Sequence, residues 1–208
     1  MLIGTVAGIL RFWQLGDLPP GLYRDEAYNG LDAIGVLEGV RPLFFENNNG
    51  REPAYIYLTA VAVALFGRTA FAVRISAAVI GTLTTIPVYL LVKAWYGQST
   101  GLFAGWIWAT TVWAIHLSRV GFRAVLLIPL LALAAWIATL ASTSQPASSR
   151  SGWLWVLSGL LYGLSFYTYL AVRLTPLFII VVTLYAIWKL RFVPWRPLSL
   201  FGAGFTVG

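Results

Sequence analysis

The carboxylates of this chain are gathered in one stretch. Seven acidic residues are present, and all of them lie between positions 17 and 52. They are Asp17, Asp25, Glu26, Asp32, Glu38, Glu46 and Glu52. A carboxylate can remove a proton from a weak nucleophile, and partial burial raises its pKa towards a useful range. A solvent-exposed loop without a function would carry mixed charges, and similar loops would occur elsewhere in the chain. The distribution of the acidic residues therefore predicts that the acidic loop forms the functional surface.

Asp25 and Glu26 are expected in the first turn of a short helix. Residues 19–21, Pro-Pro-Gly, form a predicted turn before them, and residues 25–39 are rich in helix formers up to Gly39. A simpler explanation is that acidic residues at a helix start compensate the helix dipole, which contributes about 0.3–1 kcal/mol. The local sequence leaves both explanations open.

The basic residues outnumber the acidic ones, with 14 Lys and Arg and a net charge of +7. In a soluble protein this excess would indicate nucleic-acid binding, but here the basic residues are spread between apolar runs. The pattern favours anionic headgroups of membrane lipids, or phosphorylated lipids, as partners and argues against nucleic acid. The chain contains no cysteine, which excludes disulfides and thiolate chemistry.

The elements that must position these residues are apolar. Of the 208 residues, 59% are hydrophobic and 10% charged, and the mean hydropathy is +0.79, which indicates that lipid surrounds most of the chain. Crossing about 30 Å of hydrocarbon takes a helix that rises about 1.5 Å per residue. Uncharged runs of about that length occur at 75–92, 101–117, 124–141 and 153–170, and shorter apolar runs occur at 2–15, at 174–188 and from 198 onward.

Segment 54–67 decides on which side of the membrane the later loops lie. It follows Pro53, ends at Gly67, and at about 14 residues, or roughly 21 Å, is too short to span comfortably. We therefore predict a membrane-associated helix on the side of the acidic loop, although tilt or local thinning would let the segment cross. Counts of Lys and Arg near the ends of the apolar runs do not decide between the two. In the non-crossing arrangement three basic residues join the acidic loop: Arg119, Arg123 and Arg173.

Residues 18–28, Leu-Pro-Pro-Gly-Leu-Tyr-Arg-Asp-Glu-Ala-Tyr, follow the first apolar run. This stretch resembles the first external loop of the GT-C glycosyltransferase superfamily, which includes protein O-mannosyltransferases, aminoarabinose transferases acting on lipid A, and bacterial family-39-like enzymes. The resemblance covers nearly the whole chain, because it continues through residues 49–53, 74–77, 116–119 and 167–169. The ordered series on a multispanning scaffold is more specific than an isolated Asp-Glu pair.

The resemblance implies an inverting transfer of a sugar from a polyprenyl-phosphate donor to a hydroxyl acceptor on the outer side of the membrane. Asp25 matches the acidic motif and is expected to take the proton of the acceptor as general base, while Glu26 orients the loop or the acceptor. The leaving group is a lipid phosphate, whose oxygens arginine binds bidentately. The alternative for each arginine is a role as a snorkelling anchor. The donor-phosphate candidates are Arg119 first, then Arg123 and Arg173, with Arg51 behind them.

The remaining candidate substrate contacts are aromatic side chains and one imidazole. Tyr28 lies in the matched loop, and Tyr167 and Tyr169 are candidates for lining the sugar or isoprenoid pocket, although packing at the membrane interface explains them equally well. His116, the only histidine, is a candidate for proton transfer or metal binding. A single histidine beside an aromatic-rich run is more often a packed interfacial residue.

No metal site or other cofactor is predicted. In related oligosaccharyltransferases the Ser-Arg segment is followed by an acidic metal-binding pair, whereas residues 118–125 of this chain contain no acid. A Mg or Mn site with several carboxylates cannot be built there. The departure favours a metal-independent reaction with a monophosphate donor, as in the mannosyltransferase branch.

The expected fold is an all-α polytopic membrane bundle of about six to seven helices, with short amphipathic helices in the external loop. Residues 1–15 are assigned to the first span, 16–74 to the external catalytic loop and 75–208 to further spans, with the C-terminal part of the domain missing. The expected location is a bacterial plasma membrane with the active site facing outside. There, Asp25 and Arg119 are expected to flank one cavity roughly 6–15 Å apart, which leaves room for a sugar and its phosphate.

Two alternatives from other functional classes remain open at this point. A lipid-linked sugar transporter or flippase would also use arginines on a lipid phosphate, and prolines inside the apolar runs fit that class as well. A transporter more often places its ionisable residues near the middle of the membrane, whereas these cluster at one face. A non-catalytic membrane subunit would not need Asp25.

Overall fold

The structure, a computed structural model, describes residues 2–144, 148–190 and 195–208. Within these ranges all regular elements are helices, apart from one isolated β-bridge between Phe45 and Arg51, so the prediction of an all-α bundle is confirmed. The helices are α1 Leu2–Phe12, α2 Arg24–Leu37, α3 Ala54–Phe66, α4 Ala70–Leu83, α5 Thr85–Tyr96, α6 Gln98–Thr110, α7 Val112–Arg119, η1 Arg123–Leu126, α8 Leu127–Thr143, α9 Ser149–Ser165, η2 Leu170–Leu174, α10 Thr175–Leu190 and α11 Trp195–Val207.

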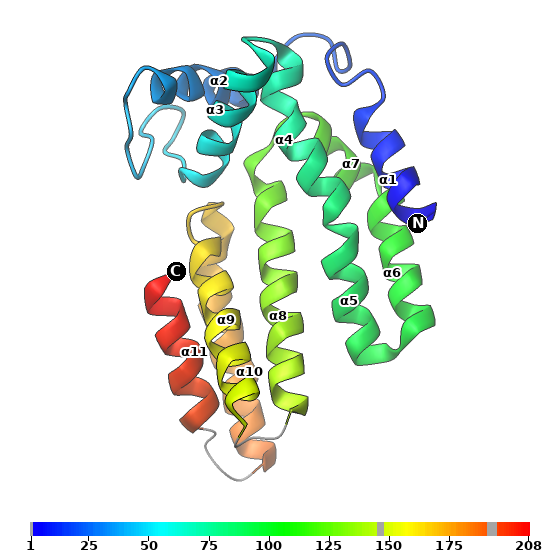
Figure 1. The fold of residues 1–208 in the computed structure, drawn as a ribbon, viewed down its shortest axis with the longest axis vertical. Coiled ribbons are helices and arrows are strands. Elements are labelled where there is room, and N and C mark those ends of the chain that lie inside the picture. The colour runs from blue at the N-terminus through cyan, green and yellow to red at the C-terminus, as the bar shows by residue number, and fades with distance from the viewer. Residues whose placement is uncertain (1, 145–147, 191–194) are drawn as a thin grey trace.

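Most of the helices run along the long axis of the molecule, and α2 and α3 lie together at one end (Figure 1). We call this end the head and define it as residues 13–69. The chain leaves the head through α4 and α5, returns through α6 and α7, and leaves again through α8. The turn between α9 and η2 also returns to the head, where the Tyr167 carbonyl accepts a hydrogen bond of 3.0 Å from the Ala54 N–H.

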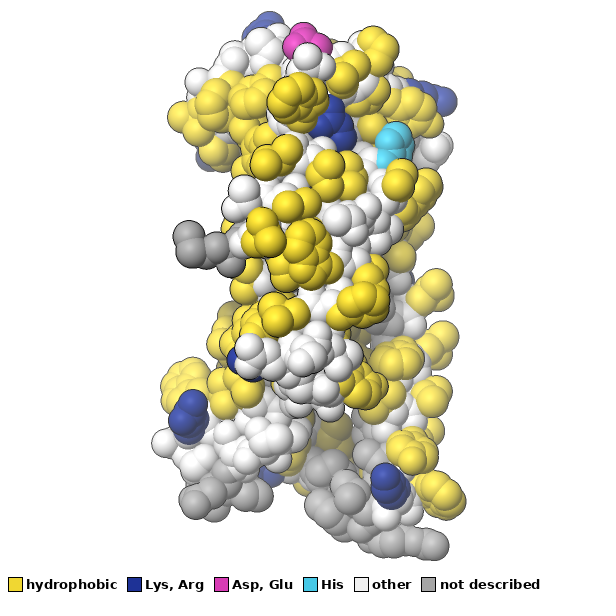
Figure 2. Space-filling view, turned by 90° about the vertical axis from the view of Figure 1, so that its right-hand side faces the viewer, with side chains coloured by type: hydrophobic (Ala, Val, Ile, Leu, Met, Phe, Trp, Pro, Cys, Tyr) yellow, Lys and Arg dark blue, Asp and Glu magenta, His cyan; other side chains and the backbone are white. Residues whose placement is uncertain are grey.

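Three helical stretches in the described part of the chain are long and apolar enough to cross a membrane. They are Ala70–Tyr96, Arg123–Thr143 and Leu170–Lys189, and Leu2–Phe12 and Ala54–Phe66 are shorter apolar helices. On the face shown in Figure 2, hydrophobic side chains cover the middle of the molecule, Asp and Glu are visible only at the head end, and Lys and Arg lie at both ends. This distribution fits an apolar belt between two polar ends.

Two of the predicted continuous runs contain a break. The run 75–92 stays within the helical stretch Ala70–Tyr96 but is interrupted between α4, which ends at Leu83, and α5 by the single residue Thr84, whose backbone remains helical with φ −59° and ψ −22°. Pro87 explains this interruption, because its ring has no N–H to donate and clashes with the carbonyl four residues earlier, that of Leu83. The run 101–117 is divided at Thr111, whose backbone is extended with φ −62° and ψ 121°.

A buried arginine supports the break between α6 and α7. Arg11 of α1 is fully buried and donates hydrogen bonds to the carbonyls of Trp108 at 3.1 Å and Ala109 at 3.0 Å, and to the Ser118 hydroxyl at 3.3 Å. Backbone carbonyls released by a helix break must find a donor elsewhere when no water is at hand. Gly81 of α4 makes room for this contact, because a Cβ there would overlap the Ser118 hydroxyl.

The short helix predicted over residues 54–67 is present as α3, which has 13 residues and lies beside α2 in the head (Figure 1). Gly67 ends it with a φ of +75°, a conformation that favours glycine. Tyr55 connects α3 to α4, because its hydroxyl donates to the Val73 carbonyl at 3.1 Å. Burial raises the pKa of this hydroxyl, which keeps it protonated as a donor. The position of α3 relative to a membrane stays a prediction.

Helices α9 and α11 approach each other through glycines. A Cβ on Gly159 would overlap the Phe201 carbonyl oxygen, and a Cβ on Gly204 would overlap that of Val156. Small residues let two backbones come this close, which is a common way for helices to associate in membranes. The close approach fixes α11 against α9.

Candidate functional site

Glu26 fixes the structure of the head and does not reach its surface. The side chain is fully buried, and its Oε1 accepts a hydrogen bond of 2.7 Å from Nε of Arg74. Its Oε2 accepts from Nη2 of Arg74 at 3.3 Å and from the backbone N–H of Tyr23 at 2.7 Å. Arg74 also donates to the carbonyls of Leu15 at 3.1 Å and Gly21 at 2.5 Å. The pair therefore attaches the loop before α2 to α4.

Asp25 lies beside this pair but faces the surface. It is half-buried, and its Oδ1 accepts a hydrogen bond of 2.7 Å from Nδ2 of Asn48. Its Oδ2 accepts no hydrogen bond from the described residues. Asn48 has a φ of +53°, which asparagine tolerates better than most residues. The turn that contains Asn48 therefore holds Asp25 in place through one carboxylate oxygen and leaves the other without a hydrogen-bond partner among the described residues.

Arg51 lies in the core of the head. It is almost fully buried and forms an ion pair with Asp32. It also donates to Oδ1 of Asn29 at 2.7 Å and to the Asn47 carbonyl at 3.2 Å, and its guanidinium stacks 5.7 Å from the ring centre of Tyr28. These contacts engage the guanidinium on all sides, so Arg51 and Tyr28 are placed as supports of the surface that carries Asp25.

Arg123 and Arg173 meet at one carboxylate, that of Glu52. Nε of Arg123 lies 3.7 Å from Oε2 of Glu52, and Nη2 of Arg173 lies 3.7 Å from Oε1. Arg123 also stacks 5.6 Å from the ring centre of Tyr169 and donates to the Gly50 carbonyl at 3.4 Å. The side chain of Arg173 is 60% exposed, whereas that of Glu52 is 6% exposed. We call Arg123, Arg173 and Glu52 the arginine cluster.

Backbone contacts from three parts of the chain build this cluster. Glu52 follows the bridge between Phe45 and Arg51, whose two hydrogen bonds measure 3.0 and 2.7 Å. Arg123 begins η1, and the turn before η1 is anchored to α2 by a hydrogen bond of 3.2 Å from Asn29 to the Gly121 carbonyl. Arg173 lies in η2, which follows the turn held by Ala54. The cluster therefore depends on tertiary contacts between segments distant in sequence.

Arg119 and His116 occupy another part of the same end of the bundle. Arg119 donates to the carbonyls of Leu10 at 3.2 Å, Arg11 at 3.3 Å and Leu18 at 2.9 Å, and so attaches α7 to the end of α1. His116 is exposed, with its ring 6.1 Å from that of Trp113. None of the contacts among the described residues joins Arg119 to Asp25, and their shared cavity stays a prediction. Arg123 instead contacts the turn that holds Asp25, because it donates to the Gly50 carbonyl at 3.4 Å and Asn48 of the same turn donates to Asp25.

Sequence reasoning missed Glu52, Asn48 and Arg74 as members of this site. A usable signal existed for Glu52, because it is an acid just before a proline in a stretch already matched to the GT-C pattern. For Arg74 the signal was its place in an apolar run, where an ionisable residue requires a partner. In the described part of the chain, no group of three or more His, Asp or Glu side chains lies together as a metal site.

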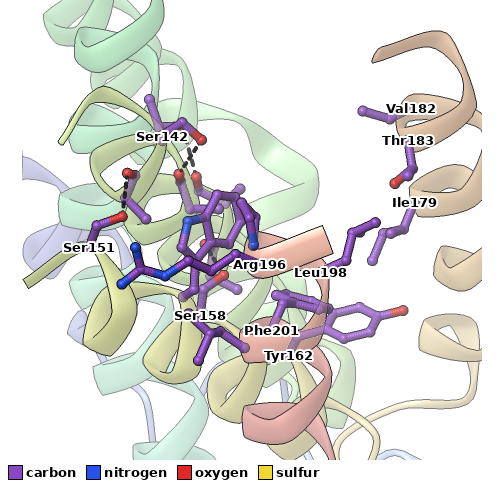
Figure 3. Close-up of a pocket in the computed structure, with 18 of the residues that line it drawn as sticks. Ser142, Ser151, Ser158, Tyr162, Ile179, Val182, Thr183, Arg196, Leu198 and Phe201 are labelled. Atoms are coloured by element: carbon purple, nitrogen blue, oxygen red, sulfur yellow. Dashed lines mark hydrogen bonds between the residues drawn. The ribbon is translucent and has the colours of Figure 1, made fainter. Parts of the chain in front are cut away.

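A large cavity lies elsewhere, between α8, α9, α10 and α11, with a volume of about 1090 Å³. Figure 3 shows Thr183 of α10 across the cavity from the serines of α8 and α9. The serine hydroxyls are occupied by hydrogen bonds to the backbone: Ser151 donates to the Ala141 carbonyl at 3.2 Å, and Ser158 donates to the Ala134 carbonyl at 2.8 Å. The lining is mainly apolar and contains no carboxylate, so this cavity offers no general base.

Comparison with known proteins gives one family model and two solved structures that resemble this chain. The family model described as dolichyl-phosphate-mannose-protein mannosyltransferase matches residues 50–204, a region that contains the arginine cluster but not Asp25. The apo structure of the Archaeoglobus fulgidus oligosaccharyltransferase superposes with a TM-score of 0.77 at 17% identity, covering 98% of this chain and 27% of that one. The structure of that protein in complex with Zn and sulfate gives 0.71 at 16% identity, with coverages of 98% and 34%.

These two likenesses show that the chain shares the fold of the corresponding part of the Archaeoglobus fulgidus oligosaccharyltransferase. The chain spans about a third or less of the length of the solved chains that it matches, 27% and 34%. No curated protein sequence gives a significant match.

Proposed function

Since this chain belongs to the dolichyl-phosphate-mannose-protein mannosyltransferase family, we propose that it is the catalytic portion of a membrane glycosyltransferase. The proposed reaction moves a sugar, with mannose as the first candidate, from a polyprenyl-phosphate donor to a hydroxyl acceptor on a protein, lipid or glycan. Family membership and the apolar helices together indicate an integral membrane protein. The observation that carries the proposal is that one turn contacts both the half-buried carboxylate of Asp25, through Asn48, and the guanidinium of Arg123, through the Gly50 carbonyl.

Arg123 and Arg173 are the proposed ligands of the donor phosphate. Arg173 is largely exposed and can turn towards a ligand, while Arg123 is held on the ring of Tyr169. Planar guanidinium groups bind phosphate oxygens through pairs of hydrogen bonds and remain charged at any physiological pH. Two of them on one phosphate would stabilise the charge that develops on the leaving group.

Asp25 is the proposed general base. Its free Oδ2 would accept the proton of the acceptor hydroxyl as the hydroxyl oxygen attacks the anomeric carbon. The bond between that carbon and the phosphate oxygen breaks in the same step, and its electron pair leaves with the lipid phosphate. Attack opposite to the leaving group inverts the anomeric configuration, and no covalent intermediate with the enzyme is needed. Glu26 and Arg51 support this arrangement from within the head.

The head is proposed to face the outer side of a bacterial plasma membrane. Lys93, Arg150, Lys189 and Arg196 lie at the ends of helices away from the head, in α5, α9, α10 and α11. The count of Lys and Arg does not select this orientation, because the head end carries more of them, including Arg24, Arg41, Arg51, Arg68 and Arg74. The proposed orientation follows from the resemblance to GT-C enzymes, whose sugar transfer takes place on the outer side of the membrane. The arrangement of α3 beside α2 fits the non-crossing topology, in which the chain passes into α4 from the side that carries Asp25.

Sugar transfer from a radiolabelled polyprenyl-phosphate mannose by the full-length protein tests this proposal. We expect Asp25→Asn to lower kcat by about 10²–10⁴-fold, the usual contribution of a general base. Asp17→Asn is the matched control, because Asp17 is exposed in the same loop, and it should retain activity. Undiminished transfer by Asp25→Asn would reject the base assignment. Movement of the labelled donor across liposomes without any transfer would instead identify a flippase.

A further inference from the structure

Among the described arginine–carboxylate contacts of the head whose carboxylates are largely shielded from solvent, two are closed pairs and one is an open arrangement. Arg74 and Glu26 are in hydrogen-bond contact at 2.7 Å, and Arg51 and Asp32 are also in direct contact. Glu52 differs, because both of its arginine contacts measure 3.7 Å, beyond hydrogen-bond length. A pair that served only to hold the fold would close as the other two do.

The open arrangement leaves buried polar atoms unused. Oε2 of Glu52 and Nε of Arg123 are both buried and have no hydrogen-bond partner among the described residues. Buried polar atoms are nearly always hydrogen-bonded in folded proteins, so two neighbouring buried atoms without hydrogen-bond partners require an explanation. The backbone that carries Glu52 is fixed on both sides, because Arg51 forms the bridge with Phe45 and Ala54, two residues after Glu52, donates to the Tyr167 carbonyl.

We propose that Glu52 is the resident counter-ion of the phosphate site, and that it competes with the lipid phosphate for Arg123 and Arg173 so that the product can leave. This inference rests on the proposed function, because it assumes that the two arginines bind the donor phosphate. Glu52 acts here as a positioning residue, since it works through the arginines and contacts neither sugar nor acceptor.

The chemistry of the reaction gives a reason for such a counter-ion. The donor is a phosphodiester with one negative charge, whereas the product is a phosphomonoester, which carries about −1.5 to −2 at pH 7. Two arginines that bind the donor well would therefore bind the product better, and slow release would limit turnover. The fixed negative charge of Glu52 repels the more highly charged product more strongly than the donor, and so reduces the difference in affinity between the two.

Ligand binding by the full-length protein tests the inference without relying on turnover. The probes are farnesyl phosphate, a monoester, and methyl farnesyl phosphate, a diester. We expect Glu52→Gln to tighten binding of the monoester by about 10-fold, and that of the diester by less, because a charge that repels the ligand is removed while the shape is kept. Glu46→Gln is the matched control, because Glu46 is exposed in the same loop, and it should leave both affinities unchanged.

The sign of the effect separates this role from a structural one, because damage to the fold does not tighten binding. Unchanged or weaker binding of the monoester by Glu52→Gln overturns the inference. If that variant does not fold, Glu52→Asp is used, because its shorter side chain withdraws the carboxylate from both guanidinium groups. We expect Glu52→Asp to tighten binding of the monoester by a smaller factor. Unchanged or weaker binding of the monoester by Glu52→Asp overturns the inference equally. The phosphate assignment itself is tested by Arg123→Gln and Arg173→Gln. If these two variants bind farnesyl phosphate more weakly while Glu52→Gln does not bind it more tightly, the phosphate assignment stands and only the role of Glu52 is refuted.

Discussion

Replacing Glu26 by glutamine should strongly destabilise the head. The buried carboxylate accepts three hydrogen bonds, two from Arg74 and one from Tyr23, at 2.7, 3.3 and 2.7 Å. A glutamine has one accepting oxygen, and its NH₂ group would face donors that it cannot satisfy. Arg74, which is also fully buried, would keep its charge without a counter-ion. Removing one partner of a buried ion pair typically costs about 3–5 kcal/mol, and we expect Glu26→Gln to fall in that range.

The free energy of unfolding of the full-length protein, measured by denaturation in mixed detergent micelles, checks this value. Glu38→Gln is the matched control, because Glu38 forms an ion pair with Arg68 at 3.5 Å in which both side chains are more than half exposed. Solvent screens such a pair, so the control should change stability by no more than about 0.5 kcal/mol. Replacing both Glu26 and Arg74 by leucine should recover only part of the loss.

The incomplete recovery has a specific structural cause. Arg74 also donates to the carbonyls of Leu15 and Gly21, and these acceptors lose their partner in the double variant. Hydrogen exchange should therefore increase first in residues 15–23, before the helices α4 and α5 open. A loss below about 1 kcal/mol for Glu26→Gln would show that the pair is not a main support of the head and would refute this reasoning.

Two glycines provide further tests of packing by the same unfolding measurement. Gly81→Ala should cost about 2 kcal/mol or more, because the new methyl group would overlap the Ser118 hydroxyl and displace it from Arg11. A cost below about 0.5 kcal/mol would show that this contact adapts easily. Gly159→Ala should cost about 1–3 kcal/mol by separating α9 from α11, because its methyl group meets a backbone carbonyl that cannot rotate away. Full stability of that variant would contradict the described packing of α11.

Most of the fold could be predicted from the sequence, because the length of an apolar run can be compared directly with the length of helix that crosses a membrane. The predicted runs 75–92, 124–141 and 174–188 lie within the long apolar helices of the structure, and the glycine at 67 ends α3 as expected. The break at Thr111 was not predictable from its neighbourhood. It depends on Arg11, whose hydrogen-bond partners Trp108 and Ala109 lie 97 and 98 positions away.

The sequence predicts which types of residue form the candidate site, but not which residues pair with one another in it. Asp25 and Glu26 are adjacent in sequence, yet one faces the surface and the other is fully buried, because successive helix positions point about 100° apart. Which arginine pairs with which acid depends on contacts such as Arg74 with Glu26, 48 positions apart. Arg51 and Glu52 are also neighbours, and only the fold shows that the first is enclosed while the second meets two arginines.

The contacts of Arg11 have a consequence for the order of synthesis. The ribosome makes this arginine before α6 and α7, so α1 enters the membrane about 97 residues ahead of the carbonyls that it needs. At roughly 5–20 residues per second, the side chain waits for about 5–20 s. An unpaired arginine opposes insertion by about 2.5–3.5 kcal/mol at a helix centre and by less in the last turn of a helix, where Arg11 lies. We therefore expect α1 to stay at the insertion machinery until α6 and α7 emerge, so that the first helix is among the last to be released into lipid.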